Sequence, residues 1–126
     1  MKLAAFLAAH ALATPGREAV ACGEIRLTFS QVDEQSTRLA SGLAARDIIV
    51  GDRVAIALAN RAEFVVAFMG VVKAGAIAIT LNPKLSPPEV AYILADATPQ
   101  ALVLEDETRA LLAKSGPLPA LRLCVD

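Results

Sequence analysis

Short apolar segments alternate with helical patterns from Gly51 onwards, and this alternation limits the fold more than any other feature. Residues 53–58 and 76–81 are nearly continuous apolar runs, as in parallel strands whose two sheet faces are both covered. Between them, residues 64–72 are apolar nearly all round, as in a buried helix. The spacing therefore predicts an α/β fold, with a mainly parallel sheet and helices on both faces.

The sequence pattern of the N-terminal part predicts a helix, a hairpin and a second helix. Residues 3–13 carry an apolar helical face, which Thr14-Pro-Gly16 ends. Residues 18–22 and 25–29 flank Gly23-Glu24, the pattern of a short hairpin. Ser30, with Asp33 three residues on, predicts the N-cap of an amphipathic helix that extends to about residue 46.

Capping residues mark the later helices. Asn60 predicts the cap of the buried helix, with Glu63 at its third position. Ser86-Pro-Pro-Glu89 combines a Ser cap, prolines where no amide hydrogen is needed and a Glu that completes a capping box. The helix that it opens extends to about Asp96. A strand at residues 101–104, a charged helix at 105–114 and a last strand at 121–125 complete the fold.

The length of 126 residues predicts a single domain, residues 1–126, but its composition is unusually apolar. Hydrophobic residues make up 56% of the chain, more than a lone soluble domain needs. We infer that further polypeptide or a partner covers part of this surface, and we expect the chain to form a homo-oligomer through an uncovered sheet edge or face. The net charge of −1 gives sequence-independent nucleic-acid binding no electrostatic basis.

The cysteines and the histidine do not form a metal site. Cys22 and Cys124 lie far apart without a Cys-x-x-Cys motif, and His10 is the single histidine. We interpret the cysteines as two buried, reduced thiols of a cytosolic protein rather than as a disulfide.

Two apolar segments have alternative interpretations. Residues 1–13 have the order of a signal peptide, but His10 interrupts the apolar run, so we favour an opening helix over export. Residues 64–81 have the hydropathy of a membrane span, but Lys73 lies inside and the pattern becomes β-branched after Gly75. A span needs about 20 continuous apolar residues. We therefore expect a buried helix followed by a strand, and no transmembrane segment.

The sequence contains no catalytic constellation. Its serines have no histidine at suitable spacing except His10, and no Gly-rich phosphate loop is present. Glu105, Asp106 and Glu107 form an acidic cluster, which we interpret as a solvated helix start stabilised by the helix dipole rather than as a metal site. We therefore predict no catalytic and no metal-ligating residue in this chain.

Six short motifs, each weak alone, occur in an order and spacing that resemble the first part of the acyl- and aryl-adenylating superfamily. They are Leu27-Thr-Phe-Ser-Gln-Val32, Gly51-Asp-Arg-Val-Ala-Ile56, Asn60-Arg-Ala-Glu-Phe64, Lys73-Ala-Gly-Ala76, Leu81-Asn-Pro83 and Glu89-Val-Ala-Tyr-Ile-Leu94. The resemblance extends from about residue 4 to 104. Asp47 departs from it, because members often have glycine there, and losing a left-handed glycine costs on the order of 1 kcal/mol.

The resemblance implies an activity for a parent enzyme. Members of this superfamily use ATP and Mg to join a carboxylic acid to AMP, and the acid–CoA ligases then transfer the acyl group to CoA. Their ATP-binding loop and the catalytic lysine of their mobile C-terminal domain have no counterpart in this sequence. We expect this chain to be the scaffold portion of a cytoplasmic acid–CoA ligase of fatty acid or aromatic acid metabolism, isolated by truncation. Its partner would be the remainder of the same polypeptide. The chain alone would be inactive, and we expect it to bind none of ATP, Mg and CoA tightly.

Three alternatives stay open. The first keeps the family but changes the acceptor, as in a peptide-synthetase adenylation module or a luciferase-like enzyme. The second is a stand-alone regulatory domain of flavodoxin or receiver type, which would need a phosphate loop or an acidic pocket that Leu58-Ala-Asn60 does not provide. The third is a structural or interaction module that uses its apolar surface for assembly.

Lys84 is the candidate cofactor-binding residue. Asn82-Pro-Lys84 follows a predicted strand, and ligands of open parallel sheets bind beyond the carboxyl ends of the strands. Lys84 and the positive end of the helix after Ser86 could together attract a phosphate. The resemblance implies the same, because some aryl-CoA ligases carry a basic residue here near the nucleotide end of CoA. The alternative is a strand-ending turn with a solvated lysine.

Overall fold

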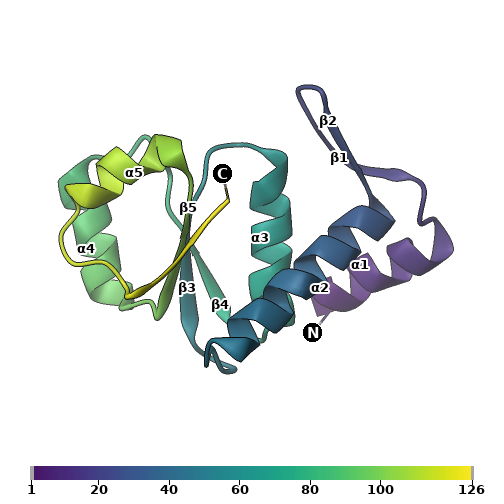
Figure 1. Cartoon of the computed structure of the whole chain (residues 1–126), viewed down its shortest axis with the longest axis horizontal. Helices are drawn as coiled ribbons and strands as arrows, with labels where there is room; N and C mark the ends of the chain where they lie inside the picture. The colour runs from purple at the N-terminus through teal and green to yellow at the C-terminus, as the bar shows by residue number, and fades with distance from the viewer. Residues whose placement is uncertain (1, 126) are drawn as a thin grey trace.

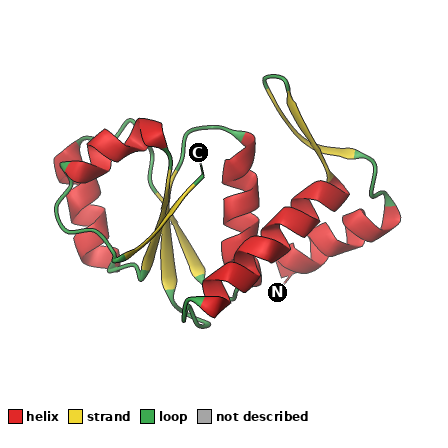
Figure 2. Cartoon of the chain, in the orientation of Figure 1, coloured by secondary structure: helices red, strands yellow, loops and turns green. Residues whose placement is uncertain are grey.

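The computed structural model describes residues 2–125 and forms a three-layer α/β fold with an N-terminal extension (Figures 1 and 2). The elements are α1 (Lys2–Ala13), β1 (Glu18–Cys22), β2 (Ile25–Thr28), α2 (Phe29–Ala45), β3 (Arg53–Ala57), α3 (Ala62–Lys73), β4 (Ile77–Thr80), α4 (Pro87–Ala97), β5 (Ala101–Leu104), α5 (Asp106–Ala113) and β6 (Leu121–Cys124).

The central sheet is parallel, with strand order β4-β3-β5-β6. Val54 of β3 pairs with Ala78 of β4 on one side and with Ala101 of β5 on the other. Figure 1 shows α3 on one face of the sheet and α4 and α5 on the opposite face. This arrangement confirms the predicted fold class, including the opening helix and the antiparallel β1–β2 hairpin.

Side chains of successive strand residues enter opposite cores because their direction alternates along a strand. Val54 and Ile56 are fully buried in the core that includes Val71 of α3. Ala55 of the same strand belongs to the second core, with Val90 of α4. The sheet is therefore the inner layer that both cores share.

Helix α2 packs closely on α3 and links the sheet to the N-terminal extension. The contact is tight at Gly70, where a Cβ would lie 2.6 Å from a Leu39 methyl carbon. At the end of α3, the Lys73 ammonium donates to Asp33 Oδ1 at 2.6 Å and to Thr37 Oγ1 at 2.9 Å. A third, smaller core then joins α1 to this pair.

Two helix starts differ from the predictions. Helix α2 begins at Phe29, because Thr28 and Gln31 form the capping box that we had assigned to Ser30 and Asp33. Arg61, and not Asn60, is the N-cap of α3, and its side chain makes no capping hydrogen bond. Glu63 consequently occupies the second helical position.

The strand β4 is an edge strand and not the covered strand that we predicted. Its end residues Ile77 and Thr80 are exposed, Ile77 to 49%, and β3 is its one partner among the described strands. Other large apolar side chains are also exposed, including Leu12 at 88% and Val50 at 81%. These surfaces agree with the inference that further polypeptide or a partner covers them, whereas self-association stays a prediction.

The structure resolves the second of the two ambiguous apolar segments, whereas the preference for an opening helix over export at residues 1–13 stays a prediction. Residues 64–81 divide at Gly75 into the end of α3 and strand β4, as predicted. Among the described residues, no helix combines the length and apolar character needed to cross a bilayer. Asp47 has a φ of 67°, the left-handed conformation that glycine adopts most readily.

The cysteines differ from the prediction in their burial. Both are free thiols, but Cys22 is half-buried and Cys124 is exposed. Cys124 lies on the edge strand β6, which has a neighbour on one side alone among the described strands.

We expect Gly70→Ala to destabilise the chain by about 1–3 kcal/mol, because the added methyl group must displace Leu39 from a packed interface. Gly42→Ala is the matched control, since a Cβ there meets just one atom, the Arg46 Nη1 at 3.6 Å. This control should gain about 0.5–1 kcal/mol from helix propensity. Urea unfolding measures both changes, and equal stabilities for the two variants would contradict the close helix contact.

Candidate functional site

A hollow in the surface of the described residues lies beyond the carboxyl ends of β3 and β4. It has a volume of about 510 Å³ and we call it the edge hollow. Neighbouring parallel strands end on the same side of a sheet, which is where ligands of open α/β sheets bind. Its lining residues are Leu58, Ala59, Asn60, Phe64, Thr80, Leu81, Asn82, Pro83 and Lys84.

Lys84 lies on the rim of the edge hollow, at the place that the sequence predicted. The side-chain oxygen of Asn82 accepts the Lys84 N–H at 2.9 Å, and the Asn82 carbonyl accepts the Leu85 N–H at 3.0 Å. This Asn turn fixes the backbone after β4 without using the Lys84 ammonium. The lysine is exposed and available to an anion, although its contact with a ligand stays a prediction.

The N-terminus of α4 does not provide the second half of the predicted phosphate site. Pro87 and Pro88 have no N–H, and Glu89 Oε1 accepts the Ser86 N–H at 3.0 Å. Hydrogen bonds from the Ser86 backbone and then its side chain lower the pKa of Glu89. The carboxylate is therefore ionised at neutral pH and opposes an incoming anion, so the attraction depends on Lys84.

Glu105 is buried, which corrects the prediction of a solvated acidic cluster. It is 2% exposed, whereas its neighbours Asp106 and Glu107 are exposed. Its Oε2 accepts the Ala59 N–H at 2.5 Å, and its Oε1 accepts from Arg61 Nη1 at 3.0 Å. The Glu105 carboxylate, directly after β5, therefore binds the segment that follows the neighbouring strand β3.

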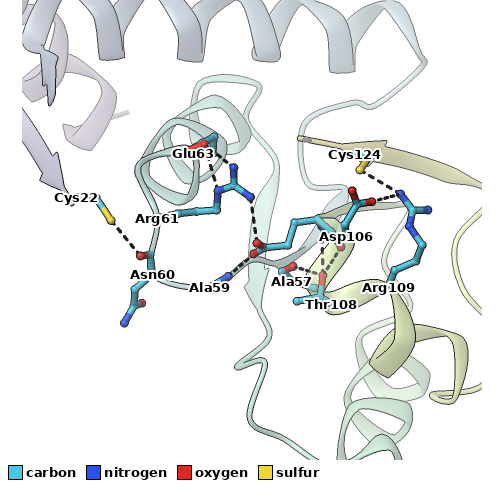
Figure 3. Close-up of polar contacts among 11 residues, drawn as sticks. Cys22, Ala57, Ala59, Asn60, Arg61, Glu63, Asp106, Thr108, Arg109 and Cys124 are labelled. Atoms are coloured by element: carbon cyan, nitrogen blue, oxygen red, sulfur yellow. Dashed lines mark hydrogen bonds and ion pairs between the residues drawn. The ribbon is translucent and has the colours of Figure 1, made fainter. Parts of the chain in front are cut away.

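The polar network includes Arg61 on one side and Thr108 on the other (Figure 3). Arg61 also donates to Glu63 Oε2 through Nη2 at 3.0 Å, so the guanidinium lies between two carboxylates. Thr108 donates to the Ala57 carbonyl at 2.8 Å and accepts the Glu105 N–H at 3.2 Å. Two independent contacts therefore join the ends of β3 and β5.

The two cysteines lie at opposite sides of this network (Figure 3). The Cys22 thiol donates to the Asn60 carbonyl at 3.2 Å, which connects the hairpin to the wall of the edge hollow. Arg109 donates to Cys124 Sγ at 3.2 Å and to Asp106 at 3.1 Å. The hydrogen bond to Asp106 is the main cause that raises the pKa of Arg109, so this guanidinium stays charged.

The remaining groups to place are candidate metal ligands and the histidine. Within residues 2–125, no three His, Cys, Asp or Glu side chains are close enough together to hold a metal ion. The His10 ring of α1 stacks on the Phe29 ring of α2 with centroids 5.1 Å apart. Sequence reasoning placed Lys84 correctly, but it missed Glu105 and Arg61, whose partnership needs the pairing of β3 with β5.

Comparison with known proteins gives one consistent similarity. The model of a family described as "AMP-binding enzyme" matches residues 7–126. A medium/long-chain-fatty-acid–CoA/3-oxocholest-4-en-26-oate–CoA ligase of Mycobacterium marinum is 40% identical over 100 residues, which cover 79% of this chain and 18% of the ligase. An isonitrile lipopeptide synthase of Mycobacterium tuberculosis is 40% identical over 107 residues, which cover 85% of this chain and 4% of the synthase.

A solved structure has the same fold. A fatty acyl CoA synthetase of Mycobacterium tuberculosis matches with a TM-score of 0.88 at 27% identity, over 98% of this chain and 26% of the synthetase chain. The chain therefore spans less than a fifth of the length of the curated relatives described above and about a quarter of this structure.

The lowered pKa of Glu89 gives the α4 cap a pH dependence. The folded pKa lies below the ordinary value of 4.5, so the stabilisation is complete above the unfolded pKa and is lost as the pH falls through the folded one. We expect Glu89→Gln to lower stability at neutral pH and to equal the wild type at acidic pH. Urea unfolding across this range, with Glu107→Gln as control, measures the difference. A difference that is independent of pH would contradict the ionised cap.

Proposed function

The chain belongs to the AMP-binding enzyme family, and from this premise we propose that it is the N-terminal scaffold portion of a cytoplasmic, AMP-forming acid–CoA ligase. The parent enzyme would activate a fatty or aromatic carboxylic acid with ATP and Mg and transfer the acyl group to CoA. The CoA ligases among the relatives support this proposal. The partner of the chain would be the remainder of the same polypeptide.

A peptide-synthetase adenylation module is the second candidate. The specific observation in its favour is that an isonitrile lipopeptide synthase and a dimodular nonribosomal peptide synthase are also relatives, the latter of Bacillus subtilis at 33% identity over 114 residues. In such a module a carrier protein would replace CoA as acceptor. The acid-activating step is common to both candidates.

The exposed position of Lys84 on the edge hollow is the observation on which we base the CoA assignment. Its ammonium is exposed on the rim of the edge hollow, beyond the carboxyl end of β4. A flexible lysine suits a phosphate that projects from a nucleotide, because it acts as a point charge without fixed geometry. We propose that it contacts a phosphate at the nucleotide end of CoA. Among the described residues, no group of three or more acidic, His or Cys side chains could hold a metal ion, so we assign Mg to no residue here.

The chain alone should have no adenylating activity, since its sequence lacks the phosphate loop of the family. We expect no pyrophosphate release above background when the purified chain is mixed with ATP, Mg, CoA and a panel of fatty and aromatic acids. A coupled pyrophosphate assay measures this, with a complete acid–CoA ligase as positive control. Acid-dependent pyrophosphate release by the chain would contradict the scaffold assignment.

Lys84→Ala should weaken CoA binding several-fold, because the loss of one exposed charge–phosphate contact costs about 1 kcal/mol. NMR titration of the labelled chain with CoA and with dephospho-CoA measures the two dissociation constants. Wild type should prefer CoA, and Lys84→Ala should lose this preference. Lys114→Ala removes another exposed lysine, outside the edge hollow, and should keep the preference for CoA. Equal preference in all three proteins would contradict the role of Lys84.

A further inference from the structure

The wall of the edge hollow opposite Lys84 is a short connection without regular structure. Strand β3 ends at Ala57 and helix α3 starts at Ala62, so four residues change the chain direction. Three of these residues, Leu58 to Asn60, line the edge hollow. A connection of this kind has few backbone hydrogen bonds of its own, and its shape depends on contacts from outside.

Glu105, the N-cap residue of α5 directly after β5, supplies these contacts and does not itself line the edge hollow. Its two carboxylate oxygens bind different parts of the wall: Oε2 accepts the Ala59 N–H at 2.5 Å, and Oε1 accepts from Arg61 at 3.0 Å. The side chain of Glu105 is 3% exposed, against 30% for that of Arg61. Water therefore cannot replace the carboxylate easily, and the two bonds are charge-assisted.

Stability alone does not account for this choice of residue. A buried ion pair seldom stabilises a fold more than apolar side chains of the same volume. The link between β3 and β5 is also made a second time, by Thr108 to the Ala57 carbonyl at 2.8 Å. What Glu105 adds is a fixed position for the Ala59 amide and for Arg61, the residues on both sides of Asn60.

We propose that Glu105 is a positioning residue for the edge hollow. It holds the wall from Ala59 to Arg61 away from Lys84, so that the space for the nucleotide end of CoA exists before the ligand binds. This inference rests on the proposed function, because it takes CoA as the ligand. The wall then loses its conformational entropy when the chain folds, so CoA binding does not have to order it.

Glu105→Gln tests the inference because it keeps the shape of the side chain and removes the charge. The first measurement is the Ala59 amide proton signal, which a short bond to a carboxylate shifts strongly downfield and which should move upfield in the variant. The second is the CoA dissociation constant from NMR titration, which should rise on the order of tenfold. Glu105→Asp, with a shorter carboxylate, should restore part of both effects.

Leu111→Ala is the control for a loss of stability without a change of the wall. Leu111 is half-buried on α5 and packs against the second core, away from the edge hollow. This variant should lose stability and keep the wild-type Ala59 signal and CoA affinity. If Glu105→Gln does not fold, Arg61→Gln removes the other half of the pair and should shift the Ala59 signal in the same direction.

Wild-type values of both the Ala59 signal and the CoA affinity in Glu105→Gln would overturn the inference. A loss of affinity in Leu111→Ala as large as in Glu105→Gln would do so too. If the wild-type chain binds no CoA, the assignment of the ligand fails separately. The Ala59 signal then decides the positioning alone: a shift in Glu105→Gln supports it, and an unchanged signal overturns it.

Discussion

A buried carboxylate directly after β5 holds the connection that lines the edge hollow. Glu105 is ionisable and almost without solvent contact, and such a group is tolerated only when strong donors surround it. The Ala59 amide and Arg61 are these donors. Because both belong to the connection after β3, the need to pair Glu105 determines the path of the chain along the edge hollow.

The rest of the chain supports this edge as a scaffold. Two apolar cores pack on opposite faces of the parallel sheet. Helix α2, which Lys73 at the end of α3 binds through Asp33, connects the sheet to the hairpin and α1. Apolar side chains and the edge strands β4 and β6 stay uncovered in the described residues. An exposed apolar surface of this kind suits a subdomain within a larger enzyme, in agreement with the small share of its relatives that the chain covers.

Local features of the fold were predictable from the sequence, and distant ones were not. The Ser86-Pro-Pro-Glu89 cap and the division at Gly75 depend on neighbouring residues, and both were predicted correctly. The burial of Glu105 depends on partners more than 40 residues away in the sequence. Its sequence neighbours are acidic and therefore suggested a solvated side chain. Lys84 lies beyond the carboxyl end of β4, as the sequence predicted, and its contact with a ligand stays a prediction. The ionised Glu89 opposes an anion at the α4 end that we had expected to assist it.

The central claim is that a loop amide is as firmly held as the core strands, because a buried carboxylate binds it. Native-state hydrogen exchange of the wild-type chain tests this directly. The account predicts that the Ala59 amide exchanges with the same opening free energy as amides of β3 and β5, through global unfolding. An Ala59 amide that exchanges by local fluctuation, as rapidly as exposed loop amides, would contradict it.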